Sequence, residues 1–164
     1  LSGIENVNGG GGNDTLRGNG SANILRGGSG VDKLYGRGGS DTLYGQTGND
    51  ILYGGGHADV LYGGGGADKL YGQSGSDVLV GGTGNDLLYG GTGDDIFDIN
   101  TGSGRAVIKD FSDGDDEIYL STGSDDITLT QFGDHVKVKY EGDLMAIIEN
   151  ITTADLTQDG AYLS

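Results

Sequence analysis

The chain has 164 residues, of which 37 are glycine and none is proline, cysteine or tryptophan, and its formal net charge is −16. Only 34% of the residues are hydrophobic, so a thin core is expected in place of a thick globular one. The charge disfavours nucleic acid and anionic membranes as partners and favours cations, and the absence of cysteine excludes disulfides and thiolate metal sites.

The chain has no long apolar run, no signal-peptide pattern and no cysteine, and these features bear on its cellular location. No apolar run approaches 18 residues, so membrane insertion is not expected. The chain begins at Leu1 without a signal-peptide pattern, and we expect it to be a fragment of a longer protein. An acidic, cysteine-free chain suits an extracellular protein that is stabilised by something other than disulfides.

The segment 9–98 consists of ten nine-residue units that follow one another without an insertion. Every unit begins with glycine, nine units carry aspartate at the sixth position, and nine carry leucine at the eighth. The exceptions are Asn23 at the sixth position of the second unit and Phe97 at the eighth position of the last. The register does not change along the whole segment.

A glycine-rich polar sequence can also be a disordered linker. A linker has no reason to place a large apolar residue at every ninth position, whereas a solenoid needs one inward side chain for each strand. The periodicity therefore favours a folded repeat, in which six turn residues alternate with a three-residue strand whose middle side chain points inward. Two units then make one coil.

The pattern Gly-Gly-x-Gly-x-Asp-x-U-x, in which U is large and apolar, resembles the nonapeptide of the repeats-in-toxin (RTX) family. The resemblance covers residues 9–98, and it extends more loosely to LSGIENV at residues 1–7 and VIKDFSDGDDEIYL at residues 107–120. It implies an all-β fold, a right-handed parallel β-roll, which is a β-solenoid with two nonapeptides per coil. We expect three segments: the N-terminal flank 1–8, the roll 9–98 and a C-terminal region 99–164.

The family pattern implies a Ca²⁺ ion between turns one coil apart, bound by sixth-position carboxylates and by carbonyl groups of the first four turn positions. Two columns of five turns would leave about eight such sites. The side chains implied are Asp14, Asp32, Asp50, Asp68 and Asp86 in the first column and Asp41, Asp59, Asp77 and Asp95 in the second, with Asn23 as a weak member. The carbonyl ligands implied are those of Gly9, Gly10, Gly11, Gly12, Gly27, Gly28, Ser29, Gly30, Gly36, Arg37, Gly38, Gly39, Gly45, Gln46, Thr47, Gly48, Gly54, Gly55, Gly56, His57, Gly63, Gly64, Gly65, Gly66, Gly72, Gln73, Ser74, Gly75, Gly81, Gly82, Thr83, Gly84, Gly90, Gly91, Thr92 and Gly93.

Ion binding and folding are expected to be a single equilibrium. Each unit buries only one large apolar side chain, and stacking brings neighbouring carboxylates of a column close enough to repel each other. A shared divalent ion reverses this repulsion, and loading should be cooperative because each coil rests on the next. A lone turn aspartate usually hydrogen-bonds to its own backbone and needs no ion, but nine in register favour coordination.

Some units depart from the pattern. Glycine is replaced at the second position by Asn19, Arg37, Gln46 and Gln73, which is tolerable if that residue contributes only its carbonyl. His57 replaces a fourth-position glycine and must adopt a conformation that glycine prefers, and no zinc role is expected for it. The second unit lacks both the fourth glycine and the aspartate, so the site between Asn23 and Asp41 is expected to be weak or empty.

The outward seventh and ninth positions differ between the two faces of the roll. One face carries an apolar column, which we expect the C-terminal region or an upstream domain to cover, with an intermolecular contact as the alternative; the column consists of Ile24, Thr42, Val60, Val78 and Ile96. Ninth-position tyrosines should stack in two ladders, Tyr35, Tyr53, Tyr71 and Tyr89 on one face and Tyr44 and Tyr62 on the other. Such ladders usually stabilise packing, although exposed aromatic rings also bind sugars.

After Asp98 the glycine period ends and short alternating segments follow. They read ITLTQF from Ile127, HVKVKY from His135 and LMAII from Leu144, with Gly133 and Asp134 as a hairpin turn between the first two. We expect a C-terminal antiparallel β cap, because an open solenoid end exposes core and unpaired backbone.

Two features of the C-terminal region have open interpretations. The acidic residues Asp110, Asp113, Asp115 and Asp116 fit either a further calcium site or a solvated loop. The tail from Thr152 is similar to the uncleaved ends by which RTX relatives are exported through type I secretion machinery.

The leading functional hypothesis is a calcium-driven folding and secretion module, unfolded in the bacterial cytosol and folded outside the cell. An upstream domain of the same polypeptide would then carry the specific activity. The alternative is a polysaccharide-binding module that uses the tyrosine ladders, with ice disfavoured because the threonines are scattered. An enzyme is not expected, because the Gly-x-Ser-x-Gly, His-Glu-x-x-His and P-loop lysine motifs are all missing.

Overall fold

The computed structural model describes residues 6–99, 104–111, 116–120, 127–132, 135–140 and 143–149. These residues form β-strands without any helix, so no described segment is a helical membrane span. The strands are β1 (Asn6–Gly11), β2 (Thr15–Arg17), β3 (Ile24–Ser29), β4 (Lys33–Gly38), β5 (Thr42–Thr47), β6 (Ile51–Gly56), β7 (Val60–Gly65), β8 (Lys69–Ser74), β9 (Val78–Thr92), β10 (Ile96–Ile99), β11 (Gly104–Ile108), β12 (Glu117–Leu120), β13 (Ile127–Phe132), β14 (His135–Tyr140) and β15 (Asp143–Glu149).

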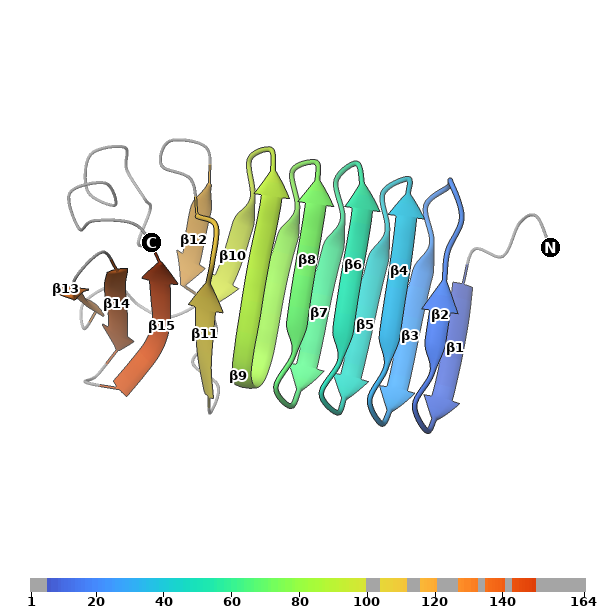
Figure 1. Ribbon diagram of the computed structural model, residues 1–164, viewed down its shortest axis with the longest axis horizontal. Coiled ribbons are helices and arrows are strands. Elements are labelled where there is room, and N and C mark those ends of the chain that lie inside the picture. Colours follow the sequence, from blue (N-terminus) through green and yellow to red (C-terminus); the bar gives the residue numbers. More distant parts are fainter. Residues whose placement is uncertain are drawn as a thin grey trace.

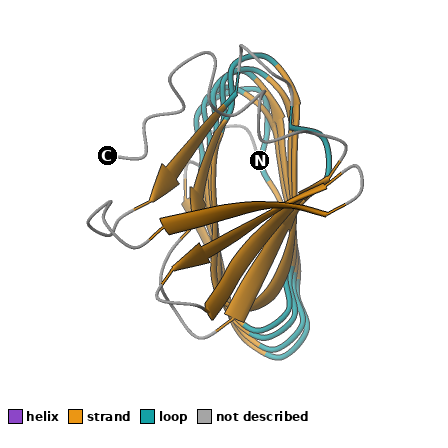
Figure 2. Ribbon diagram, turned by 90° about the vertical axis from the view of Figure 1, so that its left-hand side faces the viewer, coloured by secondary structure: helices purple, strands orange, loops and turns teal. Residues whose placement is uncertain are grey.

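The repeats wind into a flat roll with two parallel sheets (Figure 1). Sheet A contains β1, β3, β5, β7, the first part of β9, β10 and β12. Sheet B contains β2, β4, β6, β8, the second part of β9, β11, β15, β14 and β13. Figure 2 looks along the roll and shows the two sheets joined by turns at both edges. Within the repeats, paired residues such as Leu34 and Leu52 are two nonapeptides apart, which confirms the predicted parallel roll.

The strands are longer than the three residues predicted for each unit. Each of β3 to β8 has six residues, because the strand continues through the first three positions of the following turn. Gly28 pairs with Gln46 and Ser29 with Thr47, so neighbouring turns are themselves part of the parallel ladder. Only the fourth to sixth positions are left to change the direction of the chain.

The core is a single stack of eighth-position side chains. Every leucine of this row from Leu25 to Leu88, together with Phe97, is completely buried. Strand alternation places the sixth, eighth and next first position on the same inner side, as Asp32, Leu34 and Gly36 illustrate. The aspartates therefore belong to the interior of the roll.

The parallel ladder does not stop at Asp98. Strand β11 pairs with β9, and β12 pairs with β10, so one further coil is added before the antiparallel strands begin. Strand β15 then pairs in parallel with β11, while β14 and β13 follow antiparallel as predicted. The predicted turn residues Gly133 and Asp134 lie outside the described residues, and the division into three domains stays a prediction.

The described C-terminal strands close the end of the roll and do not cover its apolar column. Sheet B is lengthened by β11, β15, β14 and β13, whereas the apolar column lies on sheet A (Figure 1). Ala146 and Ile148 of β15 are fully buried because they pair with Ala106 and Ile108 of β11 and so continue the core. The expectation that this region packs against the column was therefore wrong for the described strands, since the open end offers more core to bury.

The roll also begins before the first complete nonapeptide. In β1, Asn6 pairs with Ile24 and Val7 with Leu25, so Val7 takes the eighth-position role of a preceding half-coil. This part of the predicted leading strand is confirmed, whereas residues 1–5 lie outside the described residues.

Candidate metal centre

The sixth-position residues form two buried columns, one at each edge of the roll. From Asp32 onward every repeat aspartate is at most 2% exposed, and Asp14 in the outermost coil is half-buried. The structure thus brings together the side chains that the sequence assigned to each column. The burial is severe for charged groups, because an ionised carboxylate loses its hydration in such a place.

One oxygen of each carboxylate is held by the neighbouring coil. The backbone N–H of Asp32 donates to Oδ1 of Asp50 at 2.8 Å, and that of Asp50 donates to Oδ1 of Asp68 at 2.7 Å. The second column repeats the contact, with 2.7 Å from Asp41 N–H to Asp59 Oδ1. These bonds run between coils, unlike the bond of a simple turn aspartate to its own backbone, so they orient the carboxylates without satisfying them.

The second oxygen of the carboxylates has no hydrogen-bond partner. Among the described residues, buried and unpartnered Oδ2 atoms belong to Asp14, Asp32, Asp41, Asp50, Asp59, Asp68, Asp77 and Asp95. A buried polar atom without a partner costs about 1–3 kcal/mol, and more when it is charged. A regular row of such oxygens indicates that a positive charge belongs beside each of them.

Backbone carbonyl groups converge on these oxygens. The Oδ2 of Asp32 and the carbonyl oxygen of Gly45 lie 2.4 and 2.9 Å from the point where a side chain on Gly27 would begin. The same cradle recurs at Gly63, where the distances to Asp68 Oδ2 and Gly81 O are both 2.5 Å. Glycine is required at the first position because a Cβ atom would fill the space shared by carboxylate and carbonyl.

Carbonyls of the second and fourth positions point toward the next coil. The carbonyl oxygen of Gly10 lies 2.0 Å from where a Cβ of Gly28 would stand, and that of Gly12 lies 2.1 Å from the equivalent point of Gly30. Third-position carbonyls already accept ladder bonds, as Thr47 O does from Gly30 N–H at 2.9 Å. Second-position carbonyls accept bonds as well, as Asn19 O does from Gly38 N–H at 3.2 Å. The turns therefore direct first and fourth carbonyls to the space between coils, and second and third carbonyls keep one lone pair each.

Positive φ angles produce this alternation of carbonyl directions. Four of the replaced second and fourth positions adopt the left-handed region even without glycine: Arg37 (84°), Gln46 (80°), His57 (75°) and Gln73 (83°). Asn19 and Ser21 of the second unit do not have a positive φ. The carbonyl oxygen of His57 lies 2.2 Å from where a Cβ atom of Gly75 would stand, which is the position that fourth-position glycine carbonyls take in other turns. The four replacements with a positive φ therefore preserve the backbone of the turn, as expected from the sequence.

Burial shifts the acidity of the columns. Desolvation by burial raises the pKa of Asp59, Asp68 and Asp95 to about 7. Backbone hydrogen bonds lower these pKa values, and repulsion from neighbouring aspartates raises them further. The pKa values of Asp41, Asp50, Asp77 and Asp86 are also raised, again mainly by burial. In the absence of a metal, these buried carboxylates therefore hold protons more readily than aspartates in water.

Asn23 behaves differently from the aspartates of its column. Its Oδ1 accepts a hydrogen bond from the backbone N–H of Asn19 at 2.7 Å, within its own turn. Its Nδ2 donates to Ala22 O at 3.3 Å. A neutral, locally bonded amide agrees with the expectation of a weak site between Asn23 and Asp41, which stays a prediction.

Asp116 extends the second column and was missed as a member of it. The N–H of Asp95 donates to Oδ1 of Asp116 at 3.0 Å, which repeats the contact between successive repeat aspartates. Strand β12 follows directly, with Ile118 buried as an eighth-position residue. The signal was present in the sequence, because Asp116 and Ile118 have the Asp-x-U spacing of a repeat.

Asp110, another acidic residue considered as a calcium ligand, accepts a hydrogen bond from the backbone. Its Oδ1 accepts a hydrogen bond from Gly90 N–H at 2.9 Å, where a ladder carbonyl would be expected. Burial raises its pKa, while hydrogen bonds from the N–H groups of Gly90 and Gly91 lower it. Asp113 and Asp115 lie outside the described residues, and a calcium ligand at Asp110 stays a prediction.

The donor set consists of paired carboxylates and backbone oxygens. Within the part of the chain that the structure describes, no three His, Cys, Asp or Glu side chains converge as a metal cluster. A cation in a gap between turns would therefore take its other ligands from main-chain carbonyls. Such an all-oxygen set suits a hard cation that accepts six to eight ligands.

The sequence comparison agrees with this geometry. The family model of the RTX calcium-binding nonapeptide repeat (four copies) matches residues 1–34, 35–70 and 71–105. The chain belongs to this RTX repeat family. Its repeats are calcium-binding units, and the unpartnered carboxylates with their carbonyl neighbours fit Ca²⁺. The number of ions in this RTX roll stays a prediction. No curated protein sequence matches the chain.

Two solved structures resemble the RTX chain at low identity. The extracellular lipase LipA from Serratia marcescens is 16% identical, with a TM-score of 0.44 over 89% of this chain and 39% of the lipase. The AlgE6R3 subunit of the mannuronan C5-epimerase from Azotobacter vinelandii is 22% identical, with a TM-score of 0.24 over 91% of this chain and 76% of that subunit. The chain thus spans about two-fifths of the lipase.

Proposed function

We propose that this chain is a calcium-driven folding module of a larger, secreted bacterial protein. The observation that carries the proposal is the row of buried Oδ2 atoms without hydrogen-bond partners. Removing charged carboxylates from water costs several kcal/mol each unless an opposite charge accompanies them. Bound calcium would supply that charge, while the aspartates and turn carbonyls of adjacent coils would hold it between them.

The same property would make the module a sensor of its surroundings. Extracellular calcium is near millimolar, a range that weak sites of extracellular modules match. In a low-calcium cytosol the columns would repel and the chain would stay unfolded, as export by a type I machinery requires. An upstream domain of the same polypeptide would carry the specific activity, and the roll would contribute folding and stability outside the cell.

A calcium titration of the full chain, followed by circular dichroism, tests the proposal. We expect a sigmoidal gain of β-structure with calcium and little with magnesium, because magnesium demands a tighter octahedral shell. Asp68→Ala should shift the midpoint to higher calcium, since it removes a buried ligand from the middle of a column. Asp94→Ala is the matched control, because Asp94 is an exposed turn residue. A roll that is fully formed in chelator would reject the proposal.

A second candidate function, polysaccharide binding, is favoured by the distribution of cations. In a chain with net charge −16, six of the nine basic residues lie on, or directly after, the strands of the roll portion of sheet B; they are Arg17, Lys33, Arg37, Lys69, Arg105 and Lys109. Lys109 forms an ion pair with Glu149 of β15, so the other five carry the uncompensated charge of the strip. No acidic residue occupies an outward seventh or ninth position between β2 and β11 of this sheet. Such a strip suits an extended acidic polysaccharide better than a neutral one.

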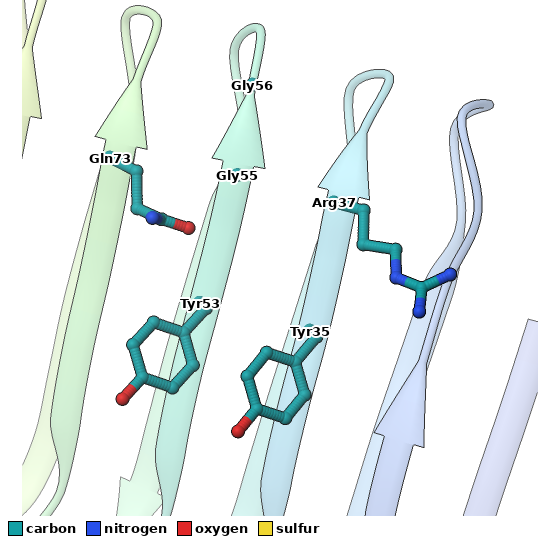
Figure 3. A pocket seen from close by; sticks show the side chains of 6 residues that line it. All are labelled: Tyr35, Arg37, Tyr53, Gly55, Gly56 and Gln73. Carbon is teal, nitrogen blue, oxygen red and sulfur yellow. The ribbon is translucent and has the colours of Figure 1, made fainter.

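The tyrosines would take part through their edges. Tyr35, Tyr53, Tyr71 and Tyr89 stack on one another at 4.7–5.0 Å and nearly parallel, so their faces are already covered within the ladder. A hollow of about 340 Å³ opens beside them, where Gly55 lacks a side chain between Arg37 and Gln73 (Figure 3). Sugar hydroxyls would meet phenol, amide and guanidinium groups there.

Binding of a linear polyuronate and of a neutral glucan, at one fixed free calcium concentration, tests this second candidate. We expect Lys33→Gln with Lys69→Gln to weaken polyuronate binding several-fold, while Arg26→Gln on the opposite sheet leaves it unchanged. Equal binding of both polymers, or an equal loss in the Arg26 variant, would rule the basic strip out.

A further inference from the structure

The first column loses its regular partner at the C-terminal end of the roll. Asp86 is its last repeat aspartate, and the residue in register one coil later is Ala106. Alanine cannot supply the carboxylate that each earlier turn receives from its neighbour. The turn 81–86 nevertheless has the first-position glycine and the buried Asp86 of a complete unit.

A small cavity lies at this position. It has a volume of about 10 Å³, and its lining includes Gly81, Gly82 and Asp86 from the last regular turn of the first column, Asp98 of β10, and residues 104–106 of β11. This volume corresponds to one water-sized sphere, so the space accommodates a single ion or water and nothing larger.

Asp98 is unusual among ninth-position residues. The other units carry arginine, tyrosine or valine there. The Oδ1 atom of Asp98 is instead buried and accepts no hydrogen bond. Burial raises the pKa of this carboxyl, and no hydrogen bond to Oδ1 offsets that rise in the described structure.

We propose that Asp98 replaces the missing sixth-position carboxylate and forms, with Asp86, a further calcium site that closes the first column. The site lies outside the nonapeptide rule, because Asp98 reaches it from the strand that precedes the turn. The inference rests on the proposed function, since it assumes that the regular turns hold calcium.

The other charged residue at this cavity is Arg105. Its side chain is exposed, and no ion pair joins it to Asp98 or Asp86 in the described structure. If it acted as the counter-ion in solution, calcium would not be needed at this place. The experiment therefore has to distinguish a bound ion from an arginine.

Two measurements on the full chain do so. Anomalous diffraction from calcium-grown crystals should show a peak between Asp86 and Asp98 in addition to those along the columns. Equilibrium dialysis with calcium should give one bound ion fewer for Asp98→Asn than for the unchanged chain. Asp94→Asn, an exposed aspartate four residues earlier, should leave the number unchanged.

The outcomes separate the inference from the proposed function. An unchanged calcium number in Asp98→Asn, or a map with peaks along the columns but none at this cavity, would overturn the inference alone. A loss of stability in Arg105→Gln equal to that of Asp98→Asn, with the same ion number, would assign the role to Arg105. A chain that binds no calcium at all would instead overturn the proposed function. If Asp98→Asn fails to fold, the diffraction map of the unchanged chain still decides.

Discussion

Side chains at second turn positions occupy backbone conformations that favour glycine. Gln73 has φ 83°, whereas Gly55 and Gly64 at the same position of other turns have 122° and 107°. The smaller angle accommodates a Cβ atom, because a Cβ on Gly55 would stand only 2.2 Å from Arg37 O. Left-handed backbone costs a residue other than glycine about 1–2 kcal/mol. The roll therefore tolerates these replacements at some loss of stability.

Gln73→Gly should stabilise the calcium-loaded roll. Relief of the left-handed strain outweighs the extra entropy of glycine in the unfolded chain, so we expect a net gain of about 0.5–1 kcal/mol. Urea unfolding at saturating calcium measures it. Ser74→Gly, one position later and without a positive φ, should destabilise. Equal effects of the two substitutions would show that strain at Gln73 is unimportant.

Protonation of the columns links stability to pH. Asp59, Asp68 and Asp95 have an ordinary pKa of 3.8, and the metal-free roll raises it to about 7. Between these values the roll holds protons that the unfolded chain has lost, so the stability of the metal-free roll falls as pH rises from about 4 to about 7. Acid should therefore partly replace calcium.

The corresponding measurement is circular dichroism in chelator between pH 4 and 8. We expect more residual β-structure near pH 5 than near pH 7.5. Calcium binding near pH 7 should also release protons, which a weakly buffered titration detects. Calcium binding with no proton release at pH 6 to 7 would contradict the raised pKa values.

Stacked tyrosines join the strands of each sheet at its outer surface. Tyr53 stacks on Tyr35 at 5.0 Å and on Tyr71 at 4.9 Å, whereas Tyr62 has, among the described residues, only Tyr44 as a stacked partner, at 5.0 Å. Arg17 lies over the Tyr35 ring at 5.1 Å and continues the ladder toward the N-terminal end. Stacking in these ladders adds stability to short strands that each bury only one leucine on their inner side.

Tyr53→Ala should therefore cost more stability than Tyr62→Ala. Each aromatic pair contributes about 0.5–1.5 kcal/mol beyond its buried area, and Tyr53 loses two pairs where Tyr62 loses one. Thermal unfolding at fixed calcium compares the two variants. If Tyr62→Ala were as destabilising as Tyr53→Ala, stacking would not be the reason for the ladder.

The complete roll behaves as a stack in which each coil contacts its neighbours. Interior coils are covered on both sides, and Leu52 is fully buried, whereas Leu16 in the first complete unit is only partly buried. The C-terminal end is covered by β11 and β15, so the two ends of the molecule differ. Stability should accordingly depend on position along the roll.

Leu52→Ala and Leu16→Ala test this gradient with the same chemical change. We expect the interior substitution to cost about 2–5 kcal/mol and the terminal one less than about 2 kcal/mol, because only a buried leucine leaves a cavity. Calcium titrations of both variants should show a larger midpoint shift for Leu52→Ala. Similar shifts would mean that the first coil is as well supported as the middle.

Much of this molecule was predictable from the repeat. Strict nine-residue spacing assigned Leu34 and its equivalents to the core, aligned Asp50 and Asp68 in one column, and required two units for each coil. The inward direction of the aspartates also followed from alternation, since the sixth and eighth positions share a face of a strand. It was overlooked because those residues were treated as part of the turn.

The end of the roll could be recognised only in three dimensions. Beyond Asp98 the spacing between equivalent residues changes, so that Asp95 meets Asp116 across 21 positions and Asp86 meets Ala106 across 20. Sequence periodicity cannot reveal such pairs, because hydrogen bonding between coils depends on position in space and tolerates turns of unequal length. For the same reason, the roles of Asp98, Asp110 and Asp116 emerged from packing at the end of the stack, where the repeat no longer dictates which residues become neighbours.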